Sequence, residues 1–239
     1  MIGLGTIINV AAILLGGLIG WLFGRFLKES LQNAIVRSTG ICVMFIGMSG
    51  ALEKILSVNE EGKLTSGGTL MMIGSMAIGT LIGELIDIDG LIEKFGNWLK
   101  KKTGNAKDNN FVEGFVTASI TVCVGAMTVV GSIEDGIDGD YTTLLVKSLL
   151  DFIIIIVMTS TLGKGCVFSA IPVAIIQGGF TLGAKLIEPY MTEAALHNLS
   201  LVGSLLIFCV GLNLLRKNSV KVANMLPAII VAVMWAFFQ

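Results

Sequence analysis

The chain has 239 residues, of which 54% are hydrophobic and only 14% are charged, and its mean hydropathy is +0.87. Soluble domains carry about 25% charged residues, so this composition excludes a soluble globular protein and indicates an integral membrane protein. The formal net charge is −1 and no basic cluster sits where a groove-reading element needs one, which argues against nucleic acid as a partner.

Apolar runs of membrane-spanning length recur along the chain. A spanning helix needs about 20 mostly apolar residues. Six uncharged runs meet this requirement, whereas 38–52 is short and 141–163 contains Lys147 and Asp151. We expect all of them to span, which predicts an all-α bundle of about eight spans in one integral membrane domain. In chain order the expected spans are 1–24, 38–52, 64–83, 114–133, 141–163, 165–184, 198–215 and 222–239.

The positive charges indicate how these spans are oriented. Lys and Arg accumulate in cytoplasmic loops. With the N-terminus outside, twelve of the 16 positive residues fall in inner loops, namely Arg25, Lys28, Arg37, Lys94, Lys100, Lys101, Lys102, Lys107, Lys164, Arg216, Lys217 and Lys221. We therefore expect a multi-pass protein of the bacterial inner membrane with both termini outside.

Three expected spans carry the pattern GxxxG, which permits close helix packing and makes a homo-oligomer plausible. The glycines are Gly16 and Gly20, Gly79 and Gly83, and Gly179 and Gly183. Each pair is followed by an amphipathic stretch and then by a helix with a similar core: "FIGMS", "CVGAM" or "CVGLN". This order predicts an internal repeat with copies at 1–58, 64–135 and 164–217.

The amphipathic stretch of the second copy, "LIEKFGNWLKKK", is the clearest of the three. A helical period places one apolar face beside several lysines, which favours a helix lying in the inner membrane interface. The face consists of Leu91, Ile92, Phe95, Trp98 and Leu99, and the counterparts in the other copies begin near Leu27 and Lys185.

The second and third copies enter the membrane from opposite sides, because the span at 141–163 reverses the chain between them. Extending the comparison, spans three to five match spans six to eight, with "KSLLDFIIIIV" loosely matching "NMLPAIIVAV". This pattern predicts an inverted repeat, which many secondary transporters use. Repeats also build channels and inert scaffolds, so the pattern alone does not assign transport.

Two ionisable residues inside the span at 141–163 are candidate functional groups. Lys147 and Asp151 lie one helical turn apart and can pair along one face. The pair is either structural or functional, in which case Asp151 is a proton or cation carboxylate and Lys147 sets its proton affinity. Neutral polar residues on the other spans either bind a small polar ligand or join helices: Asn9, Thr128, Ser132, Gln177 and Asn213.

The segment "GSIEDGIDGDY" raises the question of a metal loop. Its order lacks the alternating ligands, central glycine and distant glutamate of an EF-hand. It is either a tight outer turn or an outer vestibule for cations or amines formed by Glu134, Asp135, Asp138 and Asp140. No HExxH, Ser/His/Asp set or phosphate loop occurs, so we expect no enzyme activity, cofactor or bound metal.

The stretch "VGAMTVVGSIEDGIDGDYTTLLVKSLLD", together with the opening "GTIINVAAILLGGLIG", resembles the YdfK/YqgA-type family of bacterial integral membrane proteins of unknown function. The resemblance covers the whole chain. It implies a polytopic bacterial inner-membrane protein and supplies no substrate or site residues.

These patterns together favour a secondary transporter of a small solute or ion, with Asp151 as the coupling carboxylate and close glycine contacts that let helices slide. A channel is the first alternative and would need a continuous polar lining. A scaffold or sensor subunit is the second, and in that case Lys147 and Asp151 merely pair. The lipid bilayer is the expected partner in each case.

Overall fold

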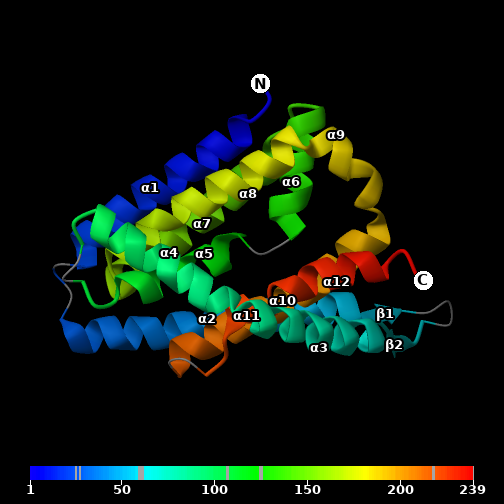
Figure 1. Cartoon of the computed structure of the whole chain (residues 1–239), viewed down its shortest axis with the longest axis horizontal. Helices are drawn as coiled ribbons and strands as arrows, with labels where there is room; N and C mark the ends of the chain where they lie inside the picture. Colours follow the sequence, from blue (N-terminus) through cyan, green and yellow to red (C-terminus); the bar gives the residue numbers. More distant parts are fainter. Residues whose placement is uncertain are drawn as a thin grey trace. The chain divides into compact units, whose positions relative to one another are not determined.

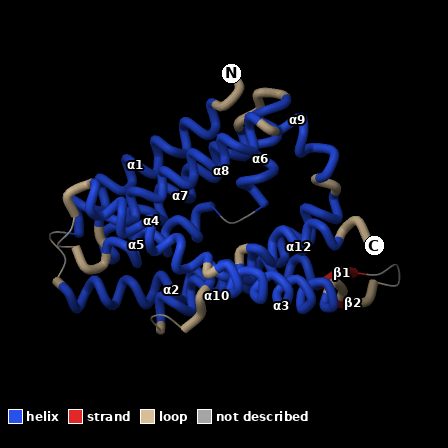
Figure 2. Tube along the Cα trace, viewed as in Figure 1, coloured by secondary structure: helices blue, strands red, loops and turns tan. Residues whose placement is uncertain are grey.

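The computed structural model describes residues 1–24, 26, 28–58, 62–105, 108–123, 126–216 and 219–238. Within them the chain is helical except for one small hairpin (Figures 1 and 2). Six helical segments are long and apolar enough to cross a membrane. They are α1 (Leu4–Gly24), α2 (Glu29–Ile55), α3 (Thr69–Ile86), α7 (Thr142–Leu162), the 3₁₀ helix η1 (Lys164–Ser169) joined to α8 (Ala170–Leu182), and α10 (Glu193–Leu215).

The remaining apolar helices are interrupted. Helices α5 (Phe111–Cys123) and α6 (Ala126–Ile137) are bent by 61° relative to each other and count as a seventh span if taken together. Near the C-terminus, α11 (Val222–Met225) and α12 (Pro227–Trp235) are short, and Pro227 begins α12 because proline is tolerated in the first turn of a helix. The chain is therefore a multi-pass α-helical membrane protein whose spanning helices contact the lipid bilayer.

Two boundaries differ from the sequence prediction. The short span expected at 38–52 and the stretch before it form one continuous helix, α2; Leu27 itself lies outside the described residues. The third span begins at Thr69 rather than at position 64, because β1 (Leu56–Val58) and β2 (Leu64–Ser66) pair as an antiparallel hairpin. Gly68, with φ at 73°, then supplies the left-handed turn that leads into α3.

The described chain divides into two compact units. Unit 1 comprises residues 1–39 and 91–189, and unit 2 comprises residues 40–90 and 190–239. The helices of unit 1 include α1, α5, α6, α7, α8 and the short α9 (Ala184–Ile187), and η2 (Glu188–Tyr190) lies at the division.

In unit 1, α1 packs along α7 in the same direction. Gly5 lies against Leu144 near the start of α7, and Gly24 lies against the backbone of Ser160 near its end. The η1–α8 segment runs opposite to α1, since the Thr6 hydroxyl lies 3.4 Å from that of Thr181 whereas Gly17 lies against Val167. Both contacts bury small residues of α1, as expected where helix backbones approach closely.

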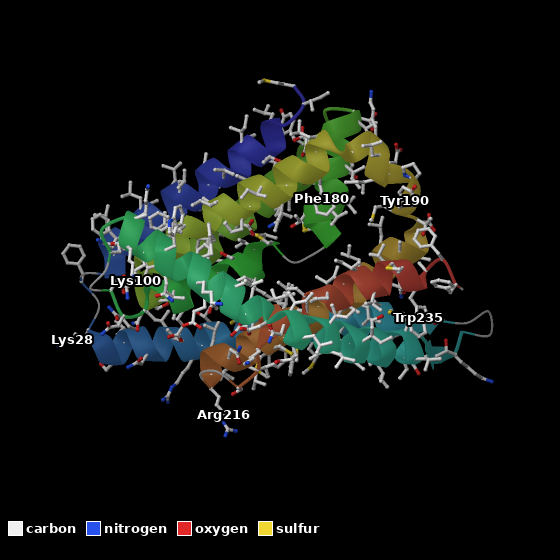
Figure 3. The ribbon with its side chains drawn as sticks, in the orientation of Figure 1. Lys28, Lys100, Phe180, Tyr190, Arg216 and Trp235 are labelled. Carbon is white, nitrogen blue, oxygen red and sulfur yellow. The ribbon has the colours of Figure 1, made fainter. Side chains whose placement is uncertain are left out.

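In unit 2, α3 runs antiparallel to the α11–α12 segment. Gly79 lies against Ala228 and Gly83 against the backbone of Asn224. At the other end of α3, the ring of Trp235 covers Gly74 (Figure 3). The apolar centre of this unit is the cluster Ala51, Met71, Leu201, Val202, Ala228 and Ala232.

Helix α4 (Ile88–Lys102) is amphipathic, as predicted. Leu99 is buried against Phe111 and Phe115 of α5, and Ile92 packs beside them. Leu91, Phe95 and Trp98 stay exposed beside Lys94, Lys100, Lys101 and Lys102, with Lys100 labelled in Figure 3. The predicted apolar face is therefore divided between packing on α5 and an outward-facing stripe.

Candidate functional site

Helix α5 ends at Cys123, and the last carbonyls of a helix have no partner within it. One of them is bound from outside the helix: the Lys147 Nζ of α7 donates to the carbonyl oxygen of Val122 at 2.7 Å. The carbonyl end of α5 is thus occupied by a buried ammonium group.

The same ammonium group pairs with a carboxylate. Lys147 Nζ lies 2.5 Å from Asp151 Oδ2, one turn further along α7, so the pairing predicted from the spacing is present. Asn9 of α1 donates through Nδ2 to the same oxygen at 3.0 Å. Lys147 is 7% exposed, Asp151 4% and Asn9 0%. One carboxylate therefore links α7 to α1, and through Lys147 to α5.

Breaking such a pair is costly. A charge removed from water is stabilised only by its partner and by further hydrogen bonds, and removal of one partner typically destabilises a protein by about 3–5 kcal/mol. Here both groups lie within a spanning helix, where ionisable residues are rare and usually mark a functional site.

Further buried polar side chains lie on α1, α6 and α8. Among the described residues, neither amide atom of Gln177 has a hydrogen-bond partner, and the same holds for the hydroxyls of Thr128 and Ser132 and for the Oδ1 of Asn9. Each of these four residues is at most 1% exposed. Because an unpaired buried polar group destabilises a protein, such atoms usually receive water or a ligand.

The helix register brings these residues to similar levels. Gly136 of α6 lies against the backbone of Thr181 on α8, and the two helices run in the same direction. One turn earlier on each helix are Ser132 and Gln177. Thr6 on α1 contacts Thr181 on α8. Because the two helices are antiparallel, one turn forward on α1, to Asn9, reaches the level of one turn back on α8, to Gln177. We call Asn9, Thr128, Lys147, Asp151, Ser132 and Gln177 the polar layer of unit 1.

The four carboxylates expected to line an outer vestibule occupy different environments. Asp138 and Asp140 are exposed, and Glu134 accepts a hydrogen bond from the Thr143 hydroxyl at 2.7 Å. Hydrogen bonds from the Thr142 side chain and backbone lower the pKa of Asp140 below its ordinary value. Asp135, in contrast, is fully buried, so the vestibule role expected for it does not fit its position.

Asp135 instead caps α1. Its two carboxylate oxygens accept the backbone N–H groups of Gly3 and Gly5, each at 3.1 Å. A carboxylate at a helix N-terminus satisfies orphan donors and interacts favourably with the helix dipole. The acidic segment thus connects α6 to the start of α1.

Asn213 does not join the polar layer. It belongs to unit 2, where its amide donates to the carbonyl of Val220 at 2.7 Å and accepts the N–H of Val220 at 3.0 Å. These two bonds join Asn213 near the end of α10 to Val220, and the binding role predicted for Asn213 stays a prediction.

The GxxxG glycines also divide into two groups. Gly16, Gly20, Gly79 and Gly83 are buried at contacts between helices, as predicted. A Cβ on Gly179 would meet nothing within 4 Å, and one on Gly183 would meet only atoms of Gly179 and Ile187. The helix contact predicted for Gly179 and Gly183 is therefore not made by the described residues.

The sequence interpretation did not identify three polar groups that form hydrogen bonds in unit 1. The Val122 carbonyl is a backbone group, which only the glycine in "CVGAM" could have suggested. The Thr6 and Thr181 hydroxyls pair between helices far apart in sequence.

Among the described residues, no group of three or more His, Cys, Asp or Glu side chains is placed to hold a metal ion.

Comparison with known sequences identifies the family. The profile that matches residues 4–237 is described as "Protein of unknown function (DUF554)". The chain belongs to the DUF554 family. The uncharacterized membrane protein YdfK of Bacillus subtilis (strain 168) is 29% identical over 227 residues, which cover 95% of this chain and 93% of that protein.

A second relative of this DUF554 chain is the uncharacterized protein YqgA of Escherichia coli (strain K12). It is 28% identical over 233 residues, covering 96% of this chain and 94% of that protein. The resemblance inferred from the sequence is thus confirmed over nearly the full length. No solved structure matches the chain significantly.

Proposed function

We propose that the protein is a secondary transporter of a small polar solute or ion across the bacterial inner membrane, with Asp151 as its coupling carboxylate. One observation carries this proposal: the buried Lys147, Asp151 and Asn9 network at the interruption of α5 and α6. Discontinuous helices that place their ends beside buried polar groups are the usual binding sites of secondary transporters.

The network couples ligand binding to helix position. Asp151 Oδ2 accepts from both Asn9 and Lys147, and Lys147 also holds the end of α5. A proton or solute that takes a place on Asp151 competes with these donors. Such competition loosens the links of α7 to α1 and to α5 together, which gives a ligand different affinities for two helix arrangements.

The unpartnered atoms of the polar layer supply the complementary half of the site. Gln177 offers both a donor and an acceptor, whereas Ser132 and Thr128 offer hydroxyls. With Lys147 and Asp151 paired, the layer has no net charge, which favours a small solute that forms hydrogen bonds.

We also propose eight spans arranged as an inverted repeat of two triplets. The first triplet is α3, α5–α6 and α7, and the second is α8, α10 and α11–α12, with members matched in that order. The composition of the units supports this. Unit 1 contains α1, α5–α6, α7 and α8, and unit 2 contains α10, α11–α12, α3 and the part of α2 from position 40 onward. Each unit thus combines two members of one triplet with one member of the other.

Helix directions support the same correspondence. In unit 1, α6 runs parallel to α8 and antiparallel to α7, since Gly131 lies against Leu144. In unit 2, Gly68 before α3 lies against Leu201 near the start of α10, so these helices are parallel. Asn198 of α10 donates to the carbonyl of Ala232 on α12, as expected for an antiparallel pair.

The proposed orientation places the N-terminus outside. In unit 1 the carboxylates of residues 134–140 lie where α6 ends and α1 begins. At the opposite end of α1, the ammonium of Lys164 lies 4.7 Å from the ring centre of Trp21. Positive residues favour the cytoplasmic side, which supports this orientation.

Cysteine labelling tests the orientation. In a background without the four native cysteines, Asp138→Cys should react with an impermeant maleimide on intact cells, and Lys101→Cys only after permeabilisation. Both positions are exposed, so accessibility to reagent depends on the side of the membrane. The opposite pattern would reverse the proposed topology.

Flux measurements test the function. Purified protein is first screened by thermal shift against cations, amino acids and small organic acids, because a ligand specific for the folded state raises its stability. Any hit is then assayed in proteoliposomes with and without a proton or sodium gradient. A transporter gives saturable uptake against the solute's gradient, and Asp151→Asn abolishes this accumulation.

The matched control is Glu193→Gln, which removes an exposed carboxylate outside the proposed vestibule and should leave uptake unchanged. Dissipative flux without accumulation would instead indicate a channel. Unchanged uptake in folded Asp151→Asn protein would contradict the coupling role, and absence of flux for every hit would favour a scaffold.

A further inference from the structure

We infer that the ammonium group of Lys147 is a resident cation: it fills a monovalent-cation site formed by Asp151, the Val122 carbonyl and α7. Lys147 Nζ lies 2.5 Å from the Asp151 carboxylate and 2.7 Å from the Val122 carbonyl oxygen. Both partners are oxygen atoms with negative charge or partial negative charge. This inference concerns cation binding and does not depend on transport.

The carbonyl belongs to the end of a helix, which strengthens its attraction for a cation. Val122 is the penultimate residue of α5, and the last carbonyls of a helix carry the negative end of its dipole. In transporters built from discontinuous helices, such helix ends coordinate coupling cations. In this protein the position is taken by a side chain of the chain itself.

The carboxylate and the ammonium group are fixed in position and buried. Asp151 Oδ2 is shared between Lys147 and Asn9, whose Nδ2 lies at 3.0 Å, so the carboxylate is oriented from α1. Lys147 and Asp151 are 7% and 4% exposed, which leaves the ammonium out of contact with bulk solvent. A bare sodium ion would have to displace the ammonium before it could reach these oxygens.

Two consequences follow. The wild-type protein should gain no specific stability from sodium, because its cation position is already filled. Truncation of Lys147 should create a vacant site of defined shape, which an added alkylammonium ion can fill. The atoms that Lys147→Ala removes correspond to propylammonium, so ethylammonium and propylammonium are the best-matched probes.

The experiment measures thermal unfolding of the purified full-length protein in detergent. Lys147→Ala should unfold at a lower temperature than wild type, and ethylammonium or propylammonium chloride should raise its Tm progressively with concentration. Tetramethylammonium, which is too bulky and has no N–H donor, should not. The double variant Lys147→Ala/Asp151→Asn should lose the alkylammonium response, because it lacks the carboxylate.

The matched control is Lys185→Ala, which removes an exposed lysine of the same unit and should show the same small salt response as wild type. A folded Lys147→Ala protein that no compact cation stabilises beyond this control would overturn the inference. If Lys147→Ala is recovered only when purified with alkylammonium, the inference is supported.

Wild-type protein provides a measurement that does not depend on the variant folding. Its Tm should be the same in sodium, potassium and choline chloride at equal ionic strength. A sodium-specific rise in Tm that disappears in Asp151→Asn would show that sodium occupies the carboxylate site, and the resident-cation assignment would then be wrong.

Discussion

Asp135 on α6 accepts the backbone N–H of Gly5 on α1 at 3.1 Å, across 130 residues of sequence. The other carboxylate oxygen accepts the N–H of Gly3 at the same distance. Because α6 follows the interruption after α5, this contact ties the second half of the broken span to the first helix of the chain. Movement of α6 and movement of α1 are therefore linked at this end of unit 1.

Asp135→Ala should destabilise the protein by about 1–3 kcal/mol, because two helix N-terminal donors lose a buried acceptor. Asp135→Asn should be less damaging, since its amide oxygen can still accept one of the two bonds. Thermal unfolding in detergent measures the stability of the three proteins, which should decrease from wild type to Asp135→Asn to Asp135→Ala.

Asp138→Ala is the control for this series, because Asp138 is exposed in the turn directly after α6. It should unfold within a degree or two of wild type, as surface substitutions usually change stability by less than about 0.5 kcal/mol. Equal effects of Asp135→Ala and Asp138→Ala would contradict the capping role.

The glycines at helix contacts give a second prediction. A Cβ at Gly20 would overlap the carbonyl of Ile156, and one at Gly83 would overlap the carbonyl of Asn224. Since neither backbone can give way cheaply, Gly20→Ala and Gly83→Ala should each lower stability by about 1–3 kcal/mol, the usual effect of overpacking. Thermal unfolding or protease resistance in detergent would detect this loss.

Gly179→Ala is the matched control in α8, where a Cβ meets nothing within 4 Å. Alanine has a higher helix propensity than glycine by up to about 1 kcal/mol, so this variant should be neutral or slightly more stable. Destabilisation of purified Gly179→Ala would show that Gly179 packs against a second copy, as the predicted homo-oligomer would require.

These features differ in how far the sequence could predict them. The pairing of Lys147 with Asp151 follows from their i, i+4 spacing, which is a local property of one helix. The apolar runs predicted most spans for the same reason. The Asn9 to Asp151 bond and the Asp135 cap depend instead on which helices become neighbours, and no local pattern contains that information.

Glycine spacing illustrates the same limit. The GxxxG pattern occurs in three expected spans, yet only the pairs in α1 and α3 lie at helix contacts made by the described residues. A small-residue pattern permits close approach but does not specify a partner. Similarly, the two short strands after α2 could not be separated from the apolar run that follows them, so the start of α3 was predicted too early.

The buried pair of the polar layer gives a third prediction, which separates structure from function. Asp151→Leu alone should destabilise the protein by about 3–5 kcal/mol, because Lys147 is left buried without its carboxylate. The double variant Lys147→Met/Asp151→Leu should recover most of this stability, because replacing a whole buried pair with apolar side chains is often tolerated.

Function should not recover with stability. If Asp151 couples transport, the double variant folds but gives no accumulation in proteoliposomes. Retained accumulation in a stable double variant would assign the pair a purely structural role and would remove the main support for the proposed mechanism.

The exposed stripe of α4 gives the last prediction. Leu91 and Trp98 project from α4 beside a run of lysines at 100–102, and Leu99 is buried against Phe115. Phe95 lies between these two faces: it is 41% exposed, and its ring centre is 5.8 Å from that of Phe115. An apolar stripe with flanking lysines is suited to the interface of a membrane that contains anionic lipid, where each lysine near the surface contributes about 1 kcal/mol.

Neutralising three lysines together, as Lys100→Gln/Lys101→Gln/Lys102→Gln, should reduce the thermal stabilisation that phosphatidylglycerol gives over phosphatidylcholine in mixed micelles. High salt should have the same effect on wild type, because it screens interactions between exposed charges. The apolar stripe is untouched in this variant, so its stabilisation by phosphatidylcholine should not change. An unaltered preference for phosphatidylglycerol would mean that the lysines of α4 face water rather than headgroups, and that α4 is held by its packing on α5 alone.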